Sequence, residues 1–381
     1  MAQILVPGEP APRFTAPALE GNPSFVFDSA AARWIVLLLL GTAATEPASA
    51  ALRLVRENRD LFDDREAAFF GVTMDPGDAE QGRIAKELPG IRWFLDYAGA
   101  VSTRFGAVSV EGGRVSHLPH WLLLDPMLRV HRRAALADGA EILGELRALK
   151  GQPPVVTTAP LLVVPEVLPP QICQQLIELY ERHGGTQTGA MKEVDGVTVH
   201  QIDLSHKRRA DYTLQDQELI AGLKDRLARV LRPMIQRAFQ FDPTRIERFI
   251  VARYDGAEGG HFRPHRDNTT KGTAHRKFAC TINLNAKDYE GGDLRFPEFG
   301  PRIYRAPTGG AVVFSCSLLH EARPVTRGRR YAFLPFLYDD AGARLREQNL
   351  AFVAPELRDY RSGLASEEAN EGGGGSQTVA P

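Results

Sequence analysis

Two imidazoles and one carboxylate occur in a pattern that could hold a metal ion. His265 and Asp267 form a His-x-Asp triplet within HFRPHRDN, and His320 ends the apolar run AVVFSCSLLH. A chain with ten histidines contains one such triplet by chance about half the time, so the triplet alone says little. Together, the three residues match the facial triad of non-haem Fe(II), which leaves open positions for a 2-oxo acid and dioxygen.

A pair of arginines follows the second histidine. Arg329 and Arg330 begin the run RRYAFLPFLYD, which is typical of a strand. Neighbouring residues of a strand point to opposite faces, so one guanidinium should point toward the metal side and the other away from it. A guanidinium can grip the distal carboxylate of 2-oxoglutarate through a forked, charge-assisted pair. The pattern therefore predicts Fe(II) with 2-oxoglutarate and O2 as cosubstrates.

The composition is that of a globular protein without a strongly charged surface. The chain has 381 residues, more than one ordinary core accommodates, so two domains are expected. The net charge of −1 gives no global basic field that would attract nucleic acid or an anionic membrane. The start MAQILVPGEPAP lacks the features of a secretory signal, and three widely spaced cysteines fit a reducing compartment. We expect a cytoplasmic protein with neither nucleic acid nor membrane as a partner.

The best candidate for a domain boundary is GQPPVVTTAP at residues 151–160. Its three prolines and its lack of helical periodicity predict an extended linker. One domain is then expected over residues 1–150 and a second over residues 161–345. Residues 346–381 form a C-terminal extension, whose polar end SEEANEGGGGSQTVAP predicts a disordered tail from about residue 366.

The two halves differ in the order of their expected elements. In the first half, strands are expected over residues 33–41 and 67–75, helices over 49–64, 79–88 and 139–150, and a hairpin over 120–134. This alternation predicts a doubly wound α/β domain. In the second half, helices over 169–184 and 216–239 precede strands over 245–255, 276–285, 293–298, 309–322 and 329–339. That order predicts an α+β domain whose sheet closes as a barrel or jelly roll, and these strands must position the candidate ligands.

The second half, about residues 163–340, resembles the 2-oxoglutarate/Fe(II) dioxygenases of the prolyl 4-hydroxylase type. The matching segments are RYDGAEGGHFRPHRD, INLNAKDYEGGDLRFPE and PTGGAVVFSCSLLHEARPVTRGRRYAF. The resemblance implies a double-stranded β-helix, or jelly-roll, fold. It also implies that His265, Asp267 and His320 are the iron ligands.

The same resemblance assigns the cosubstrate contacts. The spacing and the following YAF favour Arg330 over Arg329 and Arg327 as the residue that holds the C5 carboxylate of 2-oxoglutarate. Tyr254, Thr281 and Asn283 are assigned to the same pocket. Family members often carry a tyrosine at the place of Asn283, and also at the place of Phe262. Ascorbate is implied as the reductant.

The first half, about residues 5–150, resembles the peroxiredoxin (AhpC/TSA) branch of the thioredoxin fold through GEPAPRFTAPAL, WIVLLLLG and HWLLLDPMLRV. Peroxiredoxins carry Pro-x-x-x-Thr-x-x-Cys after the first core strand, and here Gly41, Thr45 and Ala48 occupy the three named positions. Peroxide reduction needs a thiolate, and the first cysteine of the chain is Cys173. We therefore expect a redox-dead thioredoxin-like domain, which serves as a scaffold or, less favoured, as a docking surface for a protein partner.

Together these features predict an enzyme that couples decarboxylation of 2-oxoglutarate, to succinate and CO2, with hydroxylation of an unactivated C–H bond. Asp267 favours hydroxylation, because related halogenases replace this carboxylate with a small residue. The substrate stays open between a peptide or protein of the prolyl type and a small amino-acid-like molecule. One alternative is a non-catalytic thioredoxin-fold adaptor or redox protein that uses the oxygenase half as a binding module. Another is a cupin-like metal enzyme without 2-oxoglutarate, against which Arg330 argues.

Other polar residues near the motif receive structural interpretations. His261 and His275 are not expected to be ligands. The loop DNTTKGTAHRKF is expected to be a surface turn or a substrate lid, with neither favoured. The basic stretch HKRRADY at residues 206–212 is interpreted as a solvated face rather than a substrate contact. Cys280 and Cys316 are interpreted as small core residues.

Overall fold

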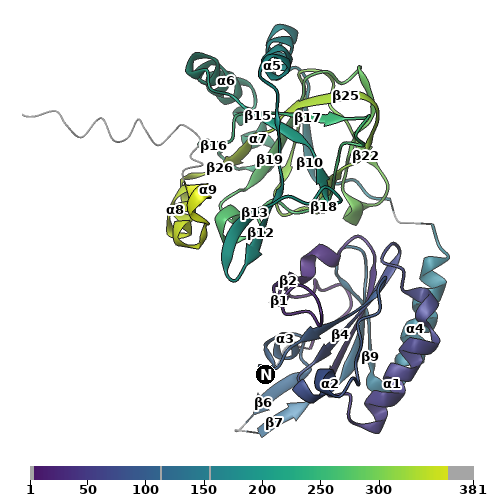
Figure 1. Cartoon of the computed structure of the whole chain (residues 1–381). Coiled ribbons are helices and arrows are strands. Elements are labelled where there is room, and N and C mark those ends of the chain that lie inside the picture. Colours follow the sequence, from purple (N-terminus) through teal and green to yellow (C-terminus); the bar gives the residue numbers. More distant parts are fainter. Residues whose placement is uncertain (1–3, 112–113, 154–155, 359–381) are drawn as a thin grey trace, which may run out of the picture. The chain divides into compact units, whose positions relative to one another are not determined.

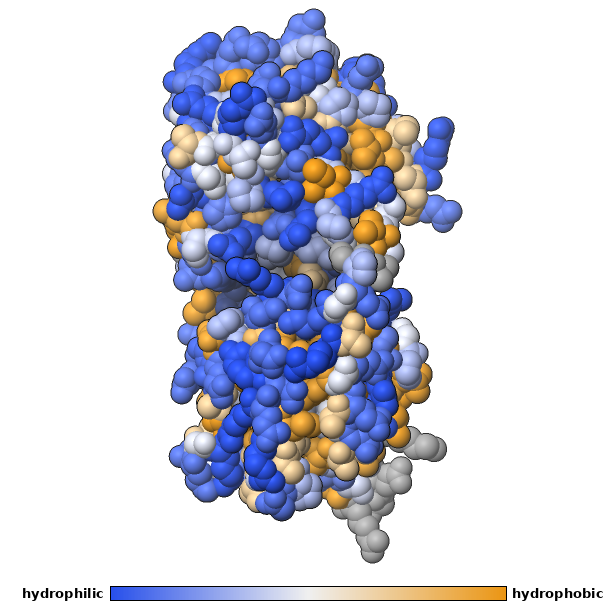
Figure 2. Space-filling model, turned by 90° about the vertical axis from the view of Figure 1, so that its right-hand side faces the viewer, coloured by the Kyte–Doolittle hydropathy of each residue, from blue (hydrophilic) through white to orange (hydrophobic). Residues whose placement is uncertain are grey.

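The computed structural model describes residues 4–111, 114–153 and 156–358 (Figure 1). The predicted tail from about residue 366 lies outside these ranges. The chain divides into two compact units: Met1–Ala159 with Phe296–Arg302, and Pro160–Arg295 with Ile303–Pro381. The face shown in Figure 2 is largely hydrophilic, with hydrophobic residues in small groups. Among the described helices, none has the length and apolarity needed to cross a bilayer.

Unit 1 is built on a five-stranded sheet of order β5-β4-β3-β8-β9. Its strands are Ile91–Leu95, Ala67–Thr73, Trp34–Gly41, His120–Leu124 and Val130–Ala135 in that order. The first three strands are parallel, and β8 and β9 run antiparallel as a hairpin. Helices α1 (Glu46–Glu57) and α4 (Gly139–Lys150) pack on one face, as Figure 1 shows. The predicted α/β thioredoxin-like architecture is confirmed.

The start of α1 is the place where a peroxiredoxin carries its nucleophile. Gly41 ends β3 with a φ of 76°, a conformation that glycine adopts without strain. Thr45 caps the helix, and its hydroxyl accepts a hydrogen bond from the N–H of Ala48 at 3.4 Å. The side chain of Ala48 is buried against the sheet together with Leu52 and Val55. The local geometry of the fold is therefore kept, and the residue at this place has no reactive atom.

One predicted helix of unit 1 is wrong. Residues 79–88 were expected to be helical, whereas α2 covers only Pro76–Glu80. Gly82 follows with a φ of 63°, which ends the helix. Ile84 is buried in the core without helical structure around it. The smaller elements of unit 1 are β1 (Thr15–Ala16), β2 (Phe25–Val26), α3 (Ala100–Arg104), β6 (Val108–Glu111) and β7 (Arg114–His117).

Unit 2 contains a major and a minor antiparallel sheet. The major sheet has the order β10-β23-β19-β25-β17-β15-β11, at Leu161–Val164, Ala311–Ser315, Phe278–Asn283, Val325–Phe333, Ile250–Asp255, Ala210–Thr213 and Thr186–Gln187. The minor sheet has the order β14-β18-β24-β21-β22, at Lys207–Arg208, His261–His265, His320–Ala322, Leu294–Arg295 and Ile303–Tyr304. This is the predicted α+β jelly roll.

Helices α5 (Pro170–His183), α6 (Gln217–Val230) and α7 (Arg232–Phe239) share a hydrophobic core with the major sheet. Residues 216–239 were expected to form one helix. The chain instead breaks at Leu231, because Pro233 cannot donate a backbone hydrogen bond and is tolerated only in the first turn of a new helix. The remaining elements are β12 (Ala190–Val194), β13 (Val197–Gln201), β16 (Arg245–Glu247), β20 (Tyr289–Gly291), β26 (Phe336–Tyr338), α8 (Asp340–Gln348) and α9 (Pro355–Arg358).

Candidate metal and cosubstrate site

The minor sheet brings His265, Asp267 and His320 together. His265 ends β18 and lies directly opposite His320, the first residue of β24, while Asp267 follows in the turn after β18. One possible ligand atom from each residue lies within 4.8 Å of the other two. The Asp267 carboxylate is 3.3 Å from Nε2 of His320 and 3.6 Å from Nε2 of His265. Two nitrogens and one oxygen thus converge on a single point.

The backbone orients both imidazoles. Nδ1 of His265 donates to the carbonyl of Arg263 at 2.8 Å, and Nδ1 of His320 donates to the carbonyl of Leu318 at 3.0 Å. These hydrogen bonds place the ring proton on Nδ1, so that each Nε2 carries the lone pair that a metal would bind. The ring of Phe262 stacks on His265 with centroids 3.4 Å apart, which further fixes the plane of that ring.

Burial of His265 and the contacts of Asp267 with the two histidines favour the protonation states that a metal needs. Burial lowers the pKa of His265 to about 4, and the nearby His320 adds to the shift, so the ring is neutral near pH 7. Burial opposes ionisation of Asp267, but His320 and His265 outweigh it and hold the pKa of this carboxyl well below its usual value. A neutral imidazole and an ionised carboxylate are the forms that bind a metal.

The two turns that carry the ligands are tied to each other. The N–H of Asp267 donates to the carbonyl of Cys316 at 3.0 Å, and the side-chain amide of Asn268 donates to the hydroxyl of Ser317 at 2.8 Å. The guanidinium of Arg266 donates to the carbonyl of Ser317. Sequence reasoning missed this clamp, because nothing in the local pattern pairs Asn268 with Ser317.

Arg330 lies in the interior of unit 2 and Arg329 on its surface, as strand alternation predicts. Arg330 is 2% exposed, while the side chain of Arg329 is 52% exposed and pairs with Asp255 at 3.0 Å. Nη2 of Arg330 lies 3.5 Å from the amide oxygen of Asn283, and its guanidinium lies 5.1 Å from the centre of the Tyr254 ring. Nε and Nη1 of Arg330 are buried and have no hydrogen-bond partner among the described residues.

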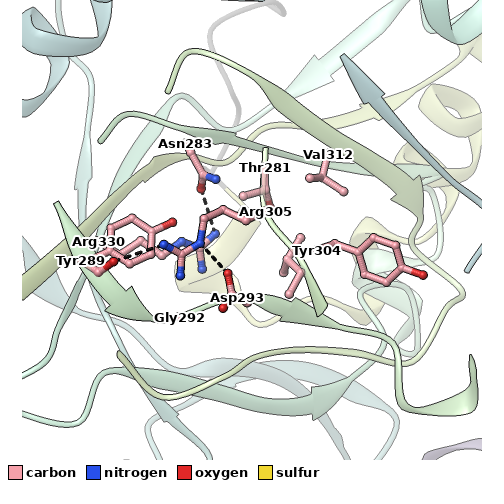
Figure 3. Close-up of a pocket in the computed structure, with 10 residues that line it drawn as sticks. Thr281, Asn283, Tyr289, Gly292, Asp293, Tyr304, Arg305, Val312 and Arg330 are labelled. Atoms are coloured by element: carbon pink, nitrogen blue, oxygen red, sulfur yellow. Dashed lines mark hydrogen bonds and ion pairs between the residues drawn. The ribbon is translucent and has the colours of Figure 1, made fainter. Parts of the chain in front are cut away.

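A small cavity adjoins this guanidinium. Figure 3 shows Arg330 below Asn283 and beside Tyr289, with Thr281 and Val312 on a neighbouring wall. Buried donors without acceptors are rare in proteins, and they indicate a place for a water, an ion or a ligand. An anionic group such as a carboxylate would complete the hydrogen bonds of Arg330.

Thr281 and Asn283 lie on β19 and both face this cavity. The amide nitrogen of Asn283 donates to the carbonyl of Ala306 at 2.8 Å, so its oxygen is directed toward Arg330. Tyr254 is buried opposite Arg330 on the neighbouring strand, and its hydroxyl lies 3.4 Å from Nη1 of Arg209. The structure therefore gathers all four residues that the sequence assigns to the cosubstrate.

The interpretation of residues 206–212 as a solvated face is wrong. Lys207 and Arg209 are 3% and 5% exposed. Lys207 donates to the hydroxyl of Thr188 at 2.8 Å and to the carbonyl of Gly189 at 2.7 Å, and Arg209 pairs with Asp211 at 2.7 Å. The partners of Lys207 lie far from it along the chain, so the stretch could not be assigned from its composition.

Two further histidines lie outside the triad. His261 contacts the carbonyls of Gly259 and Ser205. His275 is 2% exposed, and its Nε2 lies 2.6 Å from the carboxylate of Glu247. The loop that contains His275 is therefore not a plain surface turn. Cys280 and Cys316 are buried free thiols, in agreement with their interpretation as core residues.

Two family models match the chain. The model of the 2OG-Fe(II) oxygenase superfamily matches residues 249–338, a range that contains the triad and Arg330. The model of the AhpC/TSA family matches residues 7–132, which contain Ala48.

Two relatives are similar to part of the chain. The chain is 31% identical over 206 residues to a multifunctional procollagen lysine hydroxylase and glycosyltransferase of Rattus norvegicus, covering 50% of this chain and 25% of the relative. It is 35% identical over 114 residues to a PKHD-type hydroxylase of Verminephrobacter eiseniae, covering 28% of this chain and 49% of the relative. The chain thus spans half or less of the length of these two relatives.

Solved structures match each half at low identity. One is a prolyl hydroxylase from Trichoplax adhaerens, in complex with a hypoxia inducible factor peptide, at 17% identity and a TM-score of 0.38, covering 49% of this chain and 87% of that chain. Another is the peroxidoxin BcpB from Mycobacterium tuberculosis, at 18% identity and a TM-score of 0.31, covering 38% of this chain and 98% of that chain.

Proposed function

We propose that this chain, in which an AhpC/TSA-like domain precedes a domain of the 2OG-Fe(II) oxygenase superfamily, is a 2-oxoglutarate- and Fe(II)-dependent hydroxylase. The observation that carries the proposal is the pairing of a convergent His-Asp-His triad with a buried arginine whose Nε and Nη1 have no hydrogen-bond partner in the described part of the chain. A triad alone would suit a metal without a cosubstrate, and a buried arginine alone would suit any anion. Their combination fits a metal and a dicarboxylate bound side by side.

In this proposal His265, Asp267 and His320 hold Fe(II). Two imidazoles and one carboxylate suit that ion and leave positions open for a bidentate 2-oxo acid and O2. Bound iron would activate O2, which is the oxidant: one oxygen atom would go into succinate as 2-oxoglutarate loses CO2, the other into the C–H bond of the substrate, with ascorbate as an auxiliary reductant. Asp267 favours hydroxylation, because its carboxylate occupies a place that halogenation would need free.

Arg330 is proposed to bind the C5 carboxylate of 2-oxoglutarate. Its free Nε and Nη1 can donate to both oxygens of a carboxylate, and a forked pair fixes orientation as well as charge. Asn283 and Tyr254 hold the guanidinium in place, and Thr281 forms part of the wall beside it. Together these residues orient the cosubstrate toward the triad.

For the substrate we propose a peptide or protein side chain, with a small amino-acid-like molecule as the second choice. The names of the relatives support this class, because they include a procollagen lysine hydroxylase and a prolyl hydroxylase solved with a peptide. Unit 1 is proposed to act as a scaffold or as a docking domain for such a protein. We also propose that residues 1–150 and 161–345 form the two domains and that residues 151–160 link them.

The proposal is tested by measuring succinate formed from 2-oxoglutarate by the full chain with Fe(II), O2 and ascorbate. Proline-rich and lysine-containing peptides are added in turn, and the product mixture is analysed by mass spectrometry for a gain of one oxygen atom. Hydroxylated peptide with equimolar succinate is expected for at least one substrate. Absence of succinate under all conditions, with Fe(II) bound, would refute the proposal.

A further inference from the structure

A buried charged group lies near the triad but outside the cosubstrate pocket. Glu247, the last residue of β16, is 2% exposed, and His275 and Arg276 are 2% and 5% exposed. One oxygen of Glu247 pairs with Nη2 of Arg276 at 2.7 Å. The other lies 2.6 Å from Nε2 of His275 and 3.3 Å from Nε of Arg276. The carboxylate is thus held by a forked arginine pair and one imidazole.

The guanidinium of Arg276 is fixed in its plane as well as paired. It lies 4.1 Å from the centre of the Phe336 ring, close enough for a cation–π contact. Phe336 is the residue of β26 that lies directly opposite Glu247 of β16, two strands that run side by side in Figure 1. The carboxylate and the aromatic ring that hold Arg276 therefore come from one strand pair, β16 and β26, which joins the major sheet where β26 pairs with β19.

This group reaches a ligand of the triad through Arg276. Nη1 of Arg276 lies 3.5 Å from the backbone carbonyl of Asp267, at the long end of hydrogen-bonding distance. The guanidinium also interacts electrostatically with the Asp267 carboxylate. On its other side, the N–H of Asp267 donates to the carbonyl of Cys316. The backbone of this ligand is thus held from both sides, by the major sheet and by the turn that leads to His320.

Stability alone does not account well for this arrangement. A buried ion pair adds little net stability over well-packed apolar side chains, because both charges must leave water. A buried ion pair can instead serve to fix the position of a neighbouring functional group. Groups that orient metal ligands typically change metal affinity by about ten- to a hundredfold when they are removed.

We propose that Glu247, acting through Arg276, is a positioning residue of the metal site. The Glu247–Arg276 pair fixes the backbone of Asp267, so that its carboxylate meets His265 and His320 at ligand distance. The inference rests on the proposed function, because it takes the triad to be the metal site. It also assigns a role to the loop between Asp267 and β19, as a support that joins the metal ligand to the major sheet.

The test uses the full chain and Mn(II), which needs no oxidant and does not react. Mn(II) dissociation constants are measured for the wild type and for Glu247→Gln, and calorimetry gives the unfolding temperature of each metal-free protein. Glu247→Gln keeps the size of the side chain but removes the charge that holds Arg276. We expect Mn(II) affinity to fall by about ten- to a hundredfold.

A second variant separates positioning from stability. Glu247→Leu combined with Arg276→Met replaces the ion pair with apolar side chains of similar volume. Such replacements are often neutral or stabilising. We expect an unfolding temperature near that of the wild type with Mn(II) affinity still reduced about ten- to a hundredfold. This variant also gives the answer if Glu247→Gln does not fold.

Arg245→Gln is the matched control. Arg245 lies on the same strand as Glu247 and pairs with Asp340 at 2.9 Å, away from the triad. Its replacement should leave Mn(II) affinity unchanged. Wild-type Mn(II) affinity in the double variant would overturn the inference, because the pair would then serve stability alone. Absence of Mn(II) binding by the wild type would overturn the proposed function itself.

Discussion

The two units bury polar groups in different ways. In unit 1, Asp78 is fully buried at the loop where a peroxiredoxin carries its nucleophile. Its carboxylate accepts from Thr73 at 2.5 Å, from the N–H of Ala43 at 2.9 Å and from Arg83 at 2.7 Å. In unit 2, Arg330 is buried to a similar degree but leaves two N–H groups without partners among the described residues.

The difference shows which buried polar groups are structural and which are ready for a ligand. The carboxylate of Asp78 already has three donors, from Ala43, Thr73 and Arg83, so this cluster needs no ligand and fixes the backbone at Ala43. Arg330 lacks an acceptor for these two N–H groups and faces a cavity. An unpaired buried atom is not sufficient by itself, since Nε2 of His120 in unit 1 also lacks a partner in the described part of the chain. Arg330 differs because both its Nε and its Nη1 lack partners among the described residues and its guanidinium lines a pocket beside Thr281 and Asn283.

The largest expected effect is the loss of activity when the triad of unit 2 is broken. Asp267→Ala should abolish Fe(II)-dependent succinate formation, because two imidazoles alone do not make the facial triad. The variant should still unfold cooperatively. His261→Ala is the matched control, since the ring nitrogens of His261 contact backbone carbonyls, and it should stay active. Full activity of Asp267→Ala would show that the triad is not the catalytic centre.

The next effect concerns the unpaired guanidinium. Removing one partner of a buried charge pair costs on the order of 2–5 kcal/mol, so Arg330→Ala should weaken 2-oxoglutarate binding roughly thirtyfold to several thousandfold. Arg330→Lys should recover part of the loss, because the charge returns without the fork. Titration of the iron-loaded variants without oxygen measures both constants.

Arg329→Ala is the control for that titration. Its side chain is on the surface and pairs with Asp255, so 2-oxoglutarate affinity should change little. Should Arg329→Ala be the damaging change and Arg330→Ala the mild one, the cosubstrate would bind on the opposite face of β25.

A smaller effect concerns the buried ring of His120 in unit 1 and the dependence of stability on pH. Burial lowers the pKa of His120 from its ordinary value of 6.5 to about 4. The unfolded chain therefore binds this proton first, and the stability of unit 1 should fall as pH drops from 6.5 toward 4, by up to about 3 kcal/mol. His120→Asn, which cannot be protonated, should remove that part of the pH dependence.

Urea unfolding followed by tryptophan fluorescence measures this effect in the full chain. All three tryptophans, Trp34, Trp93 and Trp121, lie in unit 1, so the signal reports that unit. An unchanged slope of stability against pH in His120→Asn would assign the acid sensitivity to other groups.

The smallest expected effect is the peroxidase activity of unit 1. The wild type should not consume peroxide with a thiol reductant, because Ala48 stands where the thiolate would be. Ala48→Cys should give a trace at most, since the side chain at this place is 1% exposed. Robust turnover by the wild type would contradict the description of unit 1 as redox-dead.

The sequence predicted the features that rest on local pattern. Helix α4 was predicted at its observed bounds, and the hairpin of β8 and β9 was recognised. Strand alternation placed Arg329 and Arg330 on opposite faces, and the resemblance to the dioxygenases selected Arg330 as the inward one. The order of helices and strands indicated the fold class of both units. The strands β5 and β11 to β15 were not predicted, and two helices were misjudged where Gly82 and Pro233 interrupt them.

The features that the sequence did not predict depend on partners far along the chain. Lys207 is buried because Thr188 and Gly189 accept its hydrogen bonds, and those residues come from another segment. The loop that contains Arg276 is buried because Glu247 meets it from β16. For Lys207 the basic stretch suggested solvent, and for the loop the sequence left a surface turn and a substrate lid open. In both cases a distant partner determines the burial.

The most direct test of the proposed site is a titration of the full chain, loaded with Fe(II) under anaerobic conditions, with 2-oxoglutarate. A 2-oxo acid that chelates Fe(II) produces a visible charge-transfer absorption, which reports metal and cosubstrate together. We predict one Fe(II) per chain, an absorption that saturates with 2-oxoglutarate, and its loss in Asp267→Ala. A wild type that binds no Fe(II), or an Asp267→Ala variant with an unchanged absorption, would contradict the assignment of the metal and cosubstrate site.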